Sequence, residues 1–272
     1  MSGTEGTVHL VVDDGVALIT LDRPARRNAL DLPMWQALAT RVGEAAAAGA
    51  RTLVVTGAGS HFSAGMDLRP DNPLAPRVVQ VVFGKDRDAA HALIEELKLY
   101  LEPLRTFPGL TVAAIEGSCL GSGLEVALHC DVRVAARDSQ LALPEARWGM
   151  VADVGGTTLL TRLVGPGRAA LWVGTGRTFD AEQAFAHGVV EELCESGQAR
   201  ATALGMARDA LRCSPAASRE VLALVRTLPG QTLAHAFLRE TEAGADALLA
   251  GDVAEGLAAF AERRAPSWAP RE

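Results

Sequence analysis

The chain has 272 residues, of which 49% are apolar, and its formal net charge at pH 7 is −7. This length is sufficient for one large domain, or a domain with an appendage, around a substantial core. The acidic balance argues against nucleic acid as the main partner, because phosphate backbones require clustered Lys and Arg. No apolar stretch is long enough to span a bilayer, and the four cysteines form no CxxC pair. We therefore expect reduced thiols, no membrane association and a cytoplasmic location.

The first part of the chain predicts a hairpin, a helix and a buried strand. In Val8–Leu21, two apolar runs flank Asp13–Gly15, which is a strong hairpin-turn signal. Asp31 has the position of an N-cap for a helix over 32–48. The apolar run at 51–56 predicts a short buried strand, which leads into a glycine-containing turn.

Strands and helices alternate through the middle of the chain. Residues 70–84 contain prolines and little periodicity, which predicts a loop over the site, whereas the spacing of leucines in 85–105 predicts a helix. The elements expected next are a strand at 111–115, a helix at 121–129 and strands at 131–136 and 140–143. This recurrence of strand, turn and helix suggests stacked ββα units and not a simple Rossmann sheet. From residue 199 onward the pattern is almost wholly helical.

Two glycine-rich turns and three carboxylates are the most informative feature of the sequence. The turns are His61–Leu68 and Gly117–Glu125, and each follows an apolar, β-branched run. A strand that ends in glycines before a helix start exposes backbone N–H groups that no side chain covers. Two such donors directed at one point form an oxyanion hole, and the nearby carboxylates of Glu125, Glu145 and Asp153 supply proton transfer. The combination indicates enolate chemistry on a carbonyl compound.

The turns resemble the crotonase (enoyl-CoA hydratase/isomerase) superfamily, and the likeness extends over nearly the whole chain. The segments that carry it are ITLDRPARRNAL (19–30), GAGSHFSAGMDL (57–68), AAIEGSCLGSGLEVALHCDVRVA (113–135), LPEARWGMVADVGG (143–156) and FAERRAP (260–266). The resemblance implies an α/β fold in which residues 1–198 form a spiral of ββα units. It implies that residues 199–272 form a helical C-terminal region that builds homotrimers or hexamers. It also implies acyl-CoA thioester substrates, no separate cofactor and no metal.

By this resemblance, the backbone N–H groups of Met66 and Ser122 form the oxyanion hole around the thioester oxygen. Ser122 departs from the family pattern, which usually has glycine at that position. The change keeps the backbone donor, but a Cβ there would strain the turn if the position required a positive φ. The residues assigned to substrate and CoA binding are Ala64, Gly65, Met66, Asp67, Leu68, Gly121, Arg26 and, from an adjacent subunit, Arg263. For Asp67 we expect a structural role, as an acceptor of N–H bonds within the turn.

The three acids differ in what the resemblance implies for them. Glu125 and Glu145 match the glutamate pair with which enoyl-CoA hydratases position and activate water. Asp153 stands where typical hydratases have a small residue, whereas the dienoyl-CoA isomerase branch has a carboxylate there in a nearly identical GLAADVG sequence. Asp153 and Glu145 would then shuttle the proton while Glu125 tunes them, and all three pKa values are expected to be raised and coupled. The alternative for Asp153 is structural, as the N-cap of a helix that begins near Val154.

The favoured function is a dienoyl-CoA isomerase-like double-bond shift in an unsaturated acyl-CoA. The main alternative is the addition of water to a 2-enoyl-CoA by Glu125 and Glu145. The intact carboxylates argue against a non-catalytic CoA-binding scaffold. The acidic charge argues against RNA binding, which is known for some members of the superfamily.

Overall fold

The computed structural model describes residues 6–268, and these begin with the predicted hairpin. Strand β1 (Thr7–Asp13) pairs in antiparallel register with β2 (Val16–Asp22). The turn residues Asp14 and Gly15 have φ values of 44° and 77°. Positive φ at both positions matches the right-handed twist of the two strands. The hairpin prediction is therefore confirmed.

The strands of the described residues form two sheets, of which the larger has the order β1-β2-β3-β4-β6-β9. Beyond the hairpin, neighbouring strands in this sheet are parallel. Its further strands are β3 (Thr52–Gly57), β4 (Leu110–Ile115), β6 (Val132–Ala136) and β9 (Glu192–Cys194). Parallel strands end at the same edge, so the two glycine-rich turns, which follow β3 and β4, leave the sheet side by side.

The smaller sheet contains the second glycine-rich turn. Strand β5 (Ser118–Leu120) pairs parallel with β7 (Gln140–Ala142), which pairs antiparallel with β8 (Phe179–Asp180). Along the chain, β4, β5 and helix α4 (Ser122–Leu128) form one ββα unit, and β6, β7 and helix α5 (Gly156–Thr175) repeat the order. The predicted spiral of ββα units is confirmed. Strand β5 was not expected, because three residues within a glycine-rich turn give no periodic signal.

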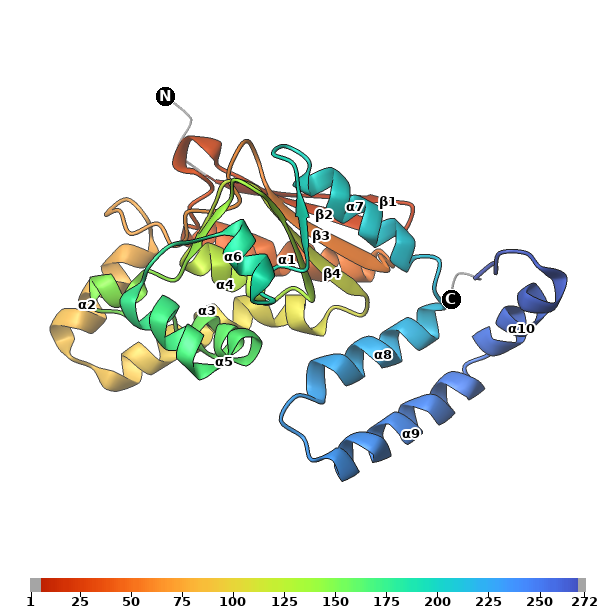
Figure 1. Ribbon diagram of the computed structural model, residues 1–272. Helices are drawn as coiled ribbons and strands as arrows, with labels where there is room; N and C mark the ends of the chain where they lie inside the picture. The colour runs from red at the N-terminus through yellow and green to blue at the C-terminus, as the bar shows by residue number, and fades with distance from the viewer. Residues whose placement is uncertain (1–5, 269–272) are drawn as a thin grey trace.

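Helices surround both sheets (Figure 1). They are α1 (Leu32–Ala47), α2 (Leu74–Gly84), α3 (Arg87–Thr106), α4 (Ser122–Leu128), α5 (Gly156–Thr175), α6 (Ala181–Ala186), α7 (Ala199–Ala210), α8 (Pro215–Thr227), α9 (Leu233–Leu249) and α10 (Asp252–Glu262). The expected N-cap of α1 is confirmed, since the Asp31 carboxylate accepts a hydrogen bond from Met34 N–H at 3.0 Å. Within residues 6–268, no helix is both long and apolar enough to cross a membrane.

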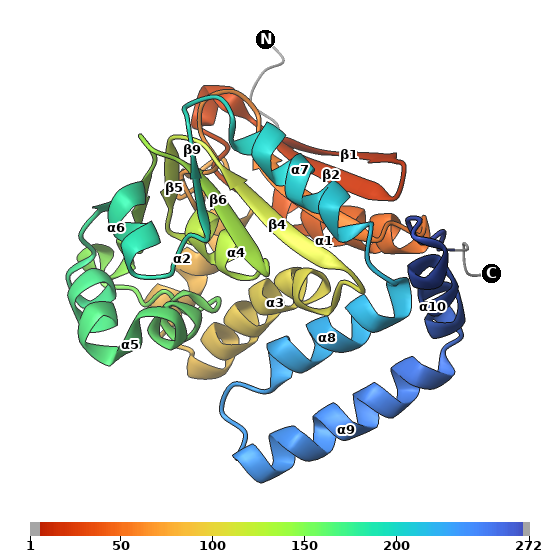
Figure 2. The same cartoon turned by 45° about the vertical axis from the view of Figure 1, so that its right-hand side comes forward.

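Successive residues of the central strands face two different apolar cores. Leu53 and Val55 contribute to the core beneath α1 and α3, whereas Val54 faces α7. Figure 2 shows α7 crossing one face of the large sheet, with α1 and α3 behind the other. The buried side of α7 consists of alanines 199, 203 and 207, spaced four residues apart. These small side chains allow the helix to lie close against the strands.

The prediction of a loop over residues 70–84 is wrong, because helix α2 occupies Leu74–Gly84. Three prolines suggested a loop. Pro70 precedes the helix, Pro73 is its N-cap and Pro76 lies in its first turn. Proline is tolerated there because the first N–H groups of a helix have no intrahelical partner. The helix expected at 85–105 is confirmed as α3, which begins after the N-cap Asp86.

Helices α8, α9 and α10 project from the rest of the chain (Figure 1). Helix α7 lies in the region expected to form the C-terminal extension, yet it packs on the sheet, so the projecting part begins with α8. Arg226 of α8 fastens this part to the core. Its guanidinium donates to both carboxylate oxygens of Asp131, at 2.7 and 2.6 Å. It also donates to the carbonyl oxygens of Phe107 and Gly109, at 2.6 and 2.7 Å.

Loss of the Arg226 contacts should destabilise the protein. The Arg226 side chain is largely buried, so Arg226→Ala would leave the Asp131 carboxylate and two carbonyl groups without their donor. We expect a loss of about 2 to 4 kcal/mol in the free energy of unfolding, measured by urea denaturation. The control is Arg239→Ala, which removes an exposed ion pair with Glu242 on α9 and should cost less than about 1 kcal/mol. Equal losses in the two variants would contradict a fastening role for Arg226.

Candidate active site

Direct contact between the two glycine-rich turns creates the site. Ser63 N–H donates to Ser118 O at 3.0 Å, and Leu120 N–H donates to Ser63 O at 2.9 Å. Gly65, with φ of 93°, lies so close to the second turn that a Cβ would stand 2.6 Å from Leu120 O and 3.2 Å from Ser122 N. Only glycine combines this conformation with this approach. The contact brings the backbone of residues 65 and 66 next to the start of α4.

Hydrogen bonds on either side hold the Met66 peptide in place. Leu30 N–H donates to Gly65 O at 2.8 Å, and Asp67 N–H donates to Leu30 O at 2.9 Å. Among the described residues, the Met66 N–H itself has no hydrogen-bond acceptor. Ser122 is the first residue of α4, so its N–H is one of the donors that a helix start leaves unused. The two N–H groups expected to form the oxyanion hole are thus available.

The serine at position 122 does not strain the second turn. The residue with positive φ is its neighbour Gly121, at 51°, and Ser122 is outside the set of residues with positive φ. A Cβ at Gly121 would stand 2.7 Å from Glu145 Oε1. The strict requirement for glycine therefore applies to position 121, and the Cβ of Ser122 is accommodated.

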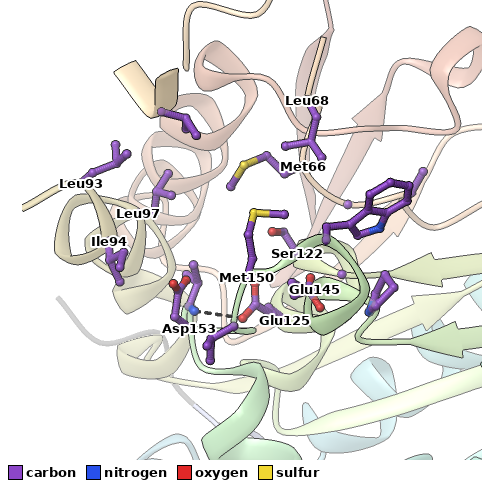
Figure 3. Close-up of a pocket in the computed structure, with 18 residues that line it drawn as sticks. Met66, Leu68, Leu93, Ile94, Leu97, Ser122, Glu125, Glu145, Met150 and Asp153 are labelled. Carbon is purple, nitrogen blue, oxygen red and sulfur yellow. Dashed lines mark hydrogen bonds between the residues drawn. The ribbon is translucent and has the colours of Figure 1, made fainter. Parts of the chain in front are cut away.

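A cavity of about 310 Å³ lies between the turns and the helices that face them (Figure 3). Its polar wall consists of the backbone from Ala64 to Met66, together with Gly121, Ser122 and the three acids. The rest of its surface is mostly apolar and comes from Leu68, Val78, Leu93, Ile94, Leu97, Pro144, Trp148, Met150, Val151 and Val154. A few polar groups in an apolar cavity are typical of a small-molecule site.

The Glu125 carboxylate is buried at the inner end of the cavity, with only 2% of the residue exposed. Its Oε1 accepts hydrogen bonds from Val154 N–H at 2.9 Å and Gly156 N–H at 3.0 Å. Burial raises the pKa of Glu125 to about 7, and the charges of Glu145 and Asp153 add to the rise. The two N–H donors oppose it. Glu125 therefore binds the segment that leads into α5, and its raised pKa lies near neutral pH.

Glu145 and Asp153 lie on opposite sides of Glu125 in the view of Figure 3. Burial raises the pKa of Glu145, and the charge of Asp153 adds to that effect. Burial likewise raises the pKa of Asp153. Glu145 Oε2 is buried without a hydrogen-bond partner among the described residues. The sequence-based expectation of raised, interacting pKa values is thus met in direction for all three acids.

Asp153 is not a helix cap. Helix α5 begins at Gly156, and its N-cap is Gly155. The structural alternative for Asp153, as the N-cap of a helix that begins near Val154, is therefore wrong. Instead, the Glu125 side chain binds the backbone N–H groups at this point. The Asp153 carboxylate lines the cavity.

Asp67 follows Met66 but does not line the cavity. Its carboxylate is buried and accepts hydrogen bonds from Arg23 Nη1 at 2.7 Å and Arg69 Nη2 at 2.5 Å. Arg69 N–H also donates to it, at 3.1 Å, as expected for a structural aspartate in a turn. The Asn72 side-chain amide donates to Asp67 O at 2.5 Å. This network holds the backbone immediately after the Met66 donor.

Two arginines assigned to CoA binding lie outside the cavity wall. Arg26 is exposed in a 3₁₀ helix (Pro24–Arg26), and the next residue, Arg27, accepts a hydrogen bond from Ala64 N–H at 2.8 Å. Arg26 therefore lies beside the first glycine-rich turn. Arg263 is the exposed C-cap of α10. In Figure 1, α10 lies on the opposite side of the molecule from α2, which contributes Val78 to the cavity. The approach of Arg263 from an adjacent subunit stays a prediction.

Residues 70–84 were expected over the site, but the individual apolar residues of the cavity walls were not predicted from the sequence. Leu93 and Leu97 show helical spacing, which indicated a buried helix face without indicating a cavity. Trp148 ends a short 3₁₀ helix that begins at Glu145, and Met150 and Val151 follow it outside any helix or strand, so no periodicity marked them. The burial of Arg23 beside Asp67 was likewise not predicted. Within residues 6–268, no cluster of His, Cys, Asp and Glu has an arrangement suited to a metal ion.

The Asp67 network should contribute stability that is lost in acid. Burial opposes ionisation of Asp67, but the hydrogen bonds from Arg69 and Arg23 outweigh it and hold its pKa at about 2, below the ordinary 3.8. Since the pKa is lower in the folded state, the contribution is complete above about pH 4 and disappears as the pH falls towards 2. Asp67→Asn should cost about 2 to 3 kcal/mol at pH 7 in urea unfolding, and progressively less below pH 4. A cost that does not change with pH would contradict this origin.

Glu125 should show the opposite dependence on pH. Its folded-state pKa of about 7 lies above the ordinary 4.5, so its ionisation destabilises the fold as the pH rises from about 4.5 to 7. Glu125→Gln cannot ionise and should gain stability relative to the wild type over this range, by up to about 3 kcal/mol. Parallel unfolding curves at pH 5 and pH 8 measure the change. A stability difference that is the same at both values would show that the Glu125 pKa is ordinary.

Comparison with known proteins places this geometry in a family. Residues 12–271 match the family model described as enoyl-CoA hydratase/isomerase. A putative enoyl-CoA hydratase of Thermus thermophilus is 33% identical, over 93% of this chain and 97% of its own. The 2,3-dehydroadipyl-CoA hydratase of Escherichia coli is 32% identical, over 94% and 96%. The crystal structure of a putative enoyl-CoA hydratase from Streptomyces coelicolor superposes with a TM-score of 0.88 at 29% identity, over 100% of this chain and 96% of that one. Two backbone donors and three carboxylates line one cavity. With this geometry and with the likeness described above, the chain belongs to the enoyl-CoA hydratase/isomerase family and has the crotonase fold.

Proposed function

We propose that this protein shifts the double bonds of a dienoyl-CoA thioester through an enolate. The observation that carries the proposal is the third carboxylate in the cavity. Asp153 lines the cavity, is not the N-cap of α5 and has a raised pKa because it is buried. A hydratase mechanism needs two acids, Glu125 and Glu145, so the presence of Asp153 favours a reaction that moves a proton between two distant carbons.

The reaction would begin with the thioester oxygen between the N–H groups of Met66 and Ser122. One of the pair Glu145 and Asp153 takes a proton from the carbon next to the thioester, and the electron pair of that C–H bond moves towards the oxygen. The other member of the pair, in its protonated form, returns a proton at the remote end of the diene. The double bonds then lie in their new positions. Glu125 stays fixed by its two N–H donors and influences the pKa values of Glu145 and Asp153.

Hydration of a 2-enoyl-CoA is the second candidate. The names of the relatives favour it, since those described above are hydratases or putative hydratases. In this reaction, Glu125 and Glu145 would position a water molecule, and Glu145 Oε2 is a buried atom without a partner among the described residues. The raised pKa values at both residues argue against a scaffold that has lost its chemistry.

The assembly we propose is a homotrimer or a dimer of trimers. The projecting helices α9 and α10 expose large apolar side chains, including Leu233, Phe237, Leu249 and Phe260. A surface of this kind marks a protein interface. In such an assembly, Arg263 of one subunit would approach the CoA bound to another.

The decisive experiment compares two substrates and two variants. Wild type and Asp153→Asn are assayed on two substrates. Isomerisation of a 3,5-dienoyl-CoA is followed by the appearance of the 2,4-dienoyl-CoA, whose double bonds are conjugated with the thioester carbonyl, and a 2-enoyl-CoA is assayed for hydration. We expect diene isomerisation to fall by about 100-fold or more in Asp153→Asn, because one of two proton carriers is lost. The exposed Asp88 of α3 provides the matched control, and Asp88→Asn should retain full activity.

The opposite pattern would reverse the assignment. Efficient hydration by the wild type that survives Asp153→Asn, together with slow isomerisation, would establish the hydratase. Activity of neither kind on either substrate would contradict both candidates for these acyl groups.

A further inference from the structure

Ser122 places a hydroxyl group in the cavity beside the oxyanion hole. The residue is only 4% exposed and lines the cavity. In Figure 3, its side chain lies between Met66 and the acids Glu125 and Glu145. Among the described residues, no group forms a hydrogen bond with its Oγ, whereas the buried Ser63 hydroxyl donates to Asn28 O and accepts from Gly65 N–H. The Ser122 hydroxyl is therefore satisfied only by what enters the cavity.

The position of Ser122 at the start of α4 determines what this hydroxyl can reach. Its own N–H is an unused donor at the first turn of the helix. The Oγ is two bonds away from the Cα of the same residue, and a hydroxyl hydrogen rotates to suit its acceptor. The N–H and O–H of one residue at a helix start can therefore both donate to a single anionic oxygen. The negative charge at this point arises on the thioester oxygen.

We propose that the Ser122 hydroxyl is a third donor to the thioester oxygen, beside the N–H groups of Met66 and Ser122. The inference rests on the proposed function for the placement of that oxygen, but it holds for either candidate reaction. When a carboxylate takes the proton from the neighbouring carbon, the C–H electron pair moves to the oxygen, and the hydroxyl keeps its own proton. The hydrogen bond strengthens as charge develops. The glycine usual in the family would lack this donor.

The test measures enolate formation without double-bond migration or hydration. The probe is butyryl-CoA, which is saturated, and the measurement is exchange of its C2 hydrogens with D₂O, followed by mass spectrometry. Ser122→Ala removes only the hydroxyl, and Ser122→Gly removes the Cβ as well, while both keep the backbone N–H. The control is Ser139→Ala, which removes a buried hydroxyl that donates to Ile115 O outside the cavity.

We expect kcat for exchange to fall by about 10-fold in Ser122→Ala and by a similar factor in Ser122→Gly. KM should change little, because the bond is stronger to the enolate than to the bound thioester. Ser139→Ala should exchange at the wild-type rate.

Three results would overturn the proposal. Wild-type exchange in Ser122→Ala would show that the hydroxyl donates nothing to the enolate. A shifted pH profile with unchanged maximal kcat would show that it bonds to a carboxyl group instead. Exchange by none of the proteins, the wild type included, would overturn the placement of the thioester oxygen. Exchange by a wild type that lacks isomerase activity would contradict only the proposed function, and the comparison of variants would still decide the role of Ser122.

Discussion

The contact between the two glycine-rich turns is the constraint on which the site depends. The turns leave neighbouring parallel strands, and hydrogen bonds between Ser63 and residues 118 and 120 join them. Gly65 then lies against Leu120 and Ser122 with no space for a side chain. This approach sets the Met66 N–H beside the first turn of α4. In the proposed reaction, these donors would need little reorganisation to bind a developing charge, because they are backbone groups of residues held on both sides.

The acids on the two sides of the Met66 N–H have pKa values shifted in opposite directions, because the groups that surround each acid differ. Behind the Met66 N–H, Asp67 is surrounded by the guanidinium groups of Arg23 and Arg69, so its carboxylate stays ionised. In the cavity, burial raises the pKa of Glu125 to about 7, the charges of Glu145 and Asp153 add to the rise, and the two N–H donors oppose it. The same type of group therefore has its pKa lowered at Asp67 and raised at Glu125.

The same carboxylate also explains the geometry of Asp153. Glu125 accepts the N–H groups of Val154 and Gly156, which binds the segment after Glu145 to α4. Asp153 belongs to this segment and lies beside the cavity without serving as the cap of α5. Residue 125 thus places residue 153, although 28 positions of sequence separate them. In the proposed reaction, Glu145 and Asp153 carry the proton, and Glu125 holds the segment that contains Asp153 in place.

The sequence by itself determined the hairpin, α1, the central strands, the glycine-rich turns and the residues that the turns would bring together. Each depends on a signal within a few adjacent residues, such as the Asp31 cap or the apolar, β-branched run of β3. Only the tertiary structure decided that Pro73 and Pro76 begin a helix, that residues 118–120 form a strand and that Asp153 is free of the helix start. It alone revealed the apolar walls from α2, α3 and the segment around Trp148, and the unpartnered hydroxyl of Ser122. These features arise from contacts between segments distant in the chain, and local patterns do not encode such contacts.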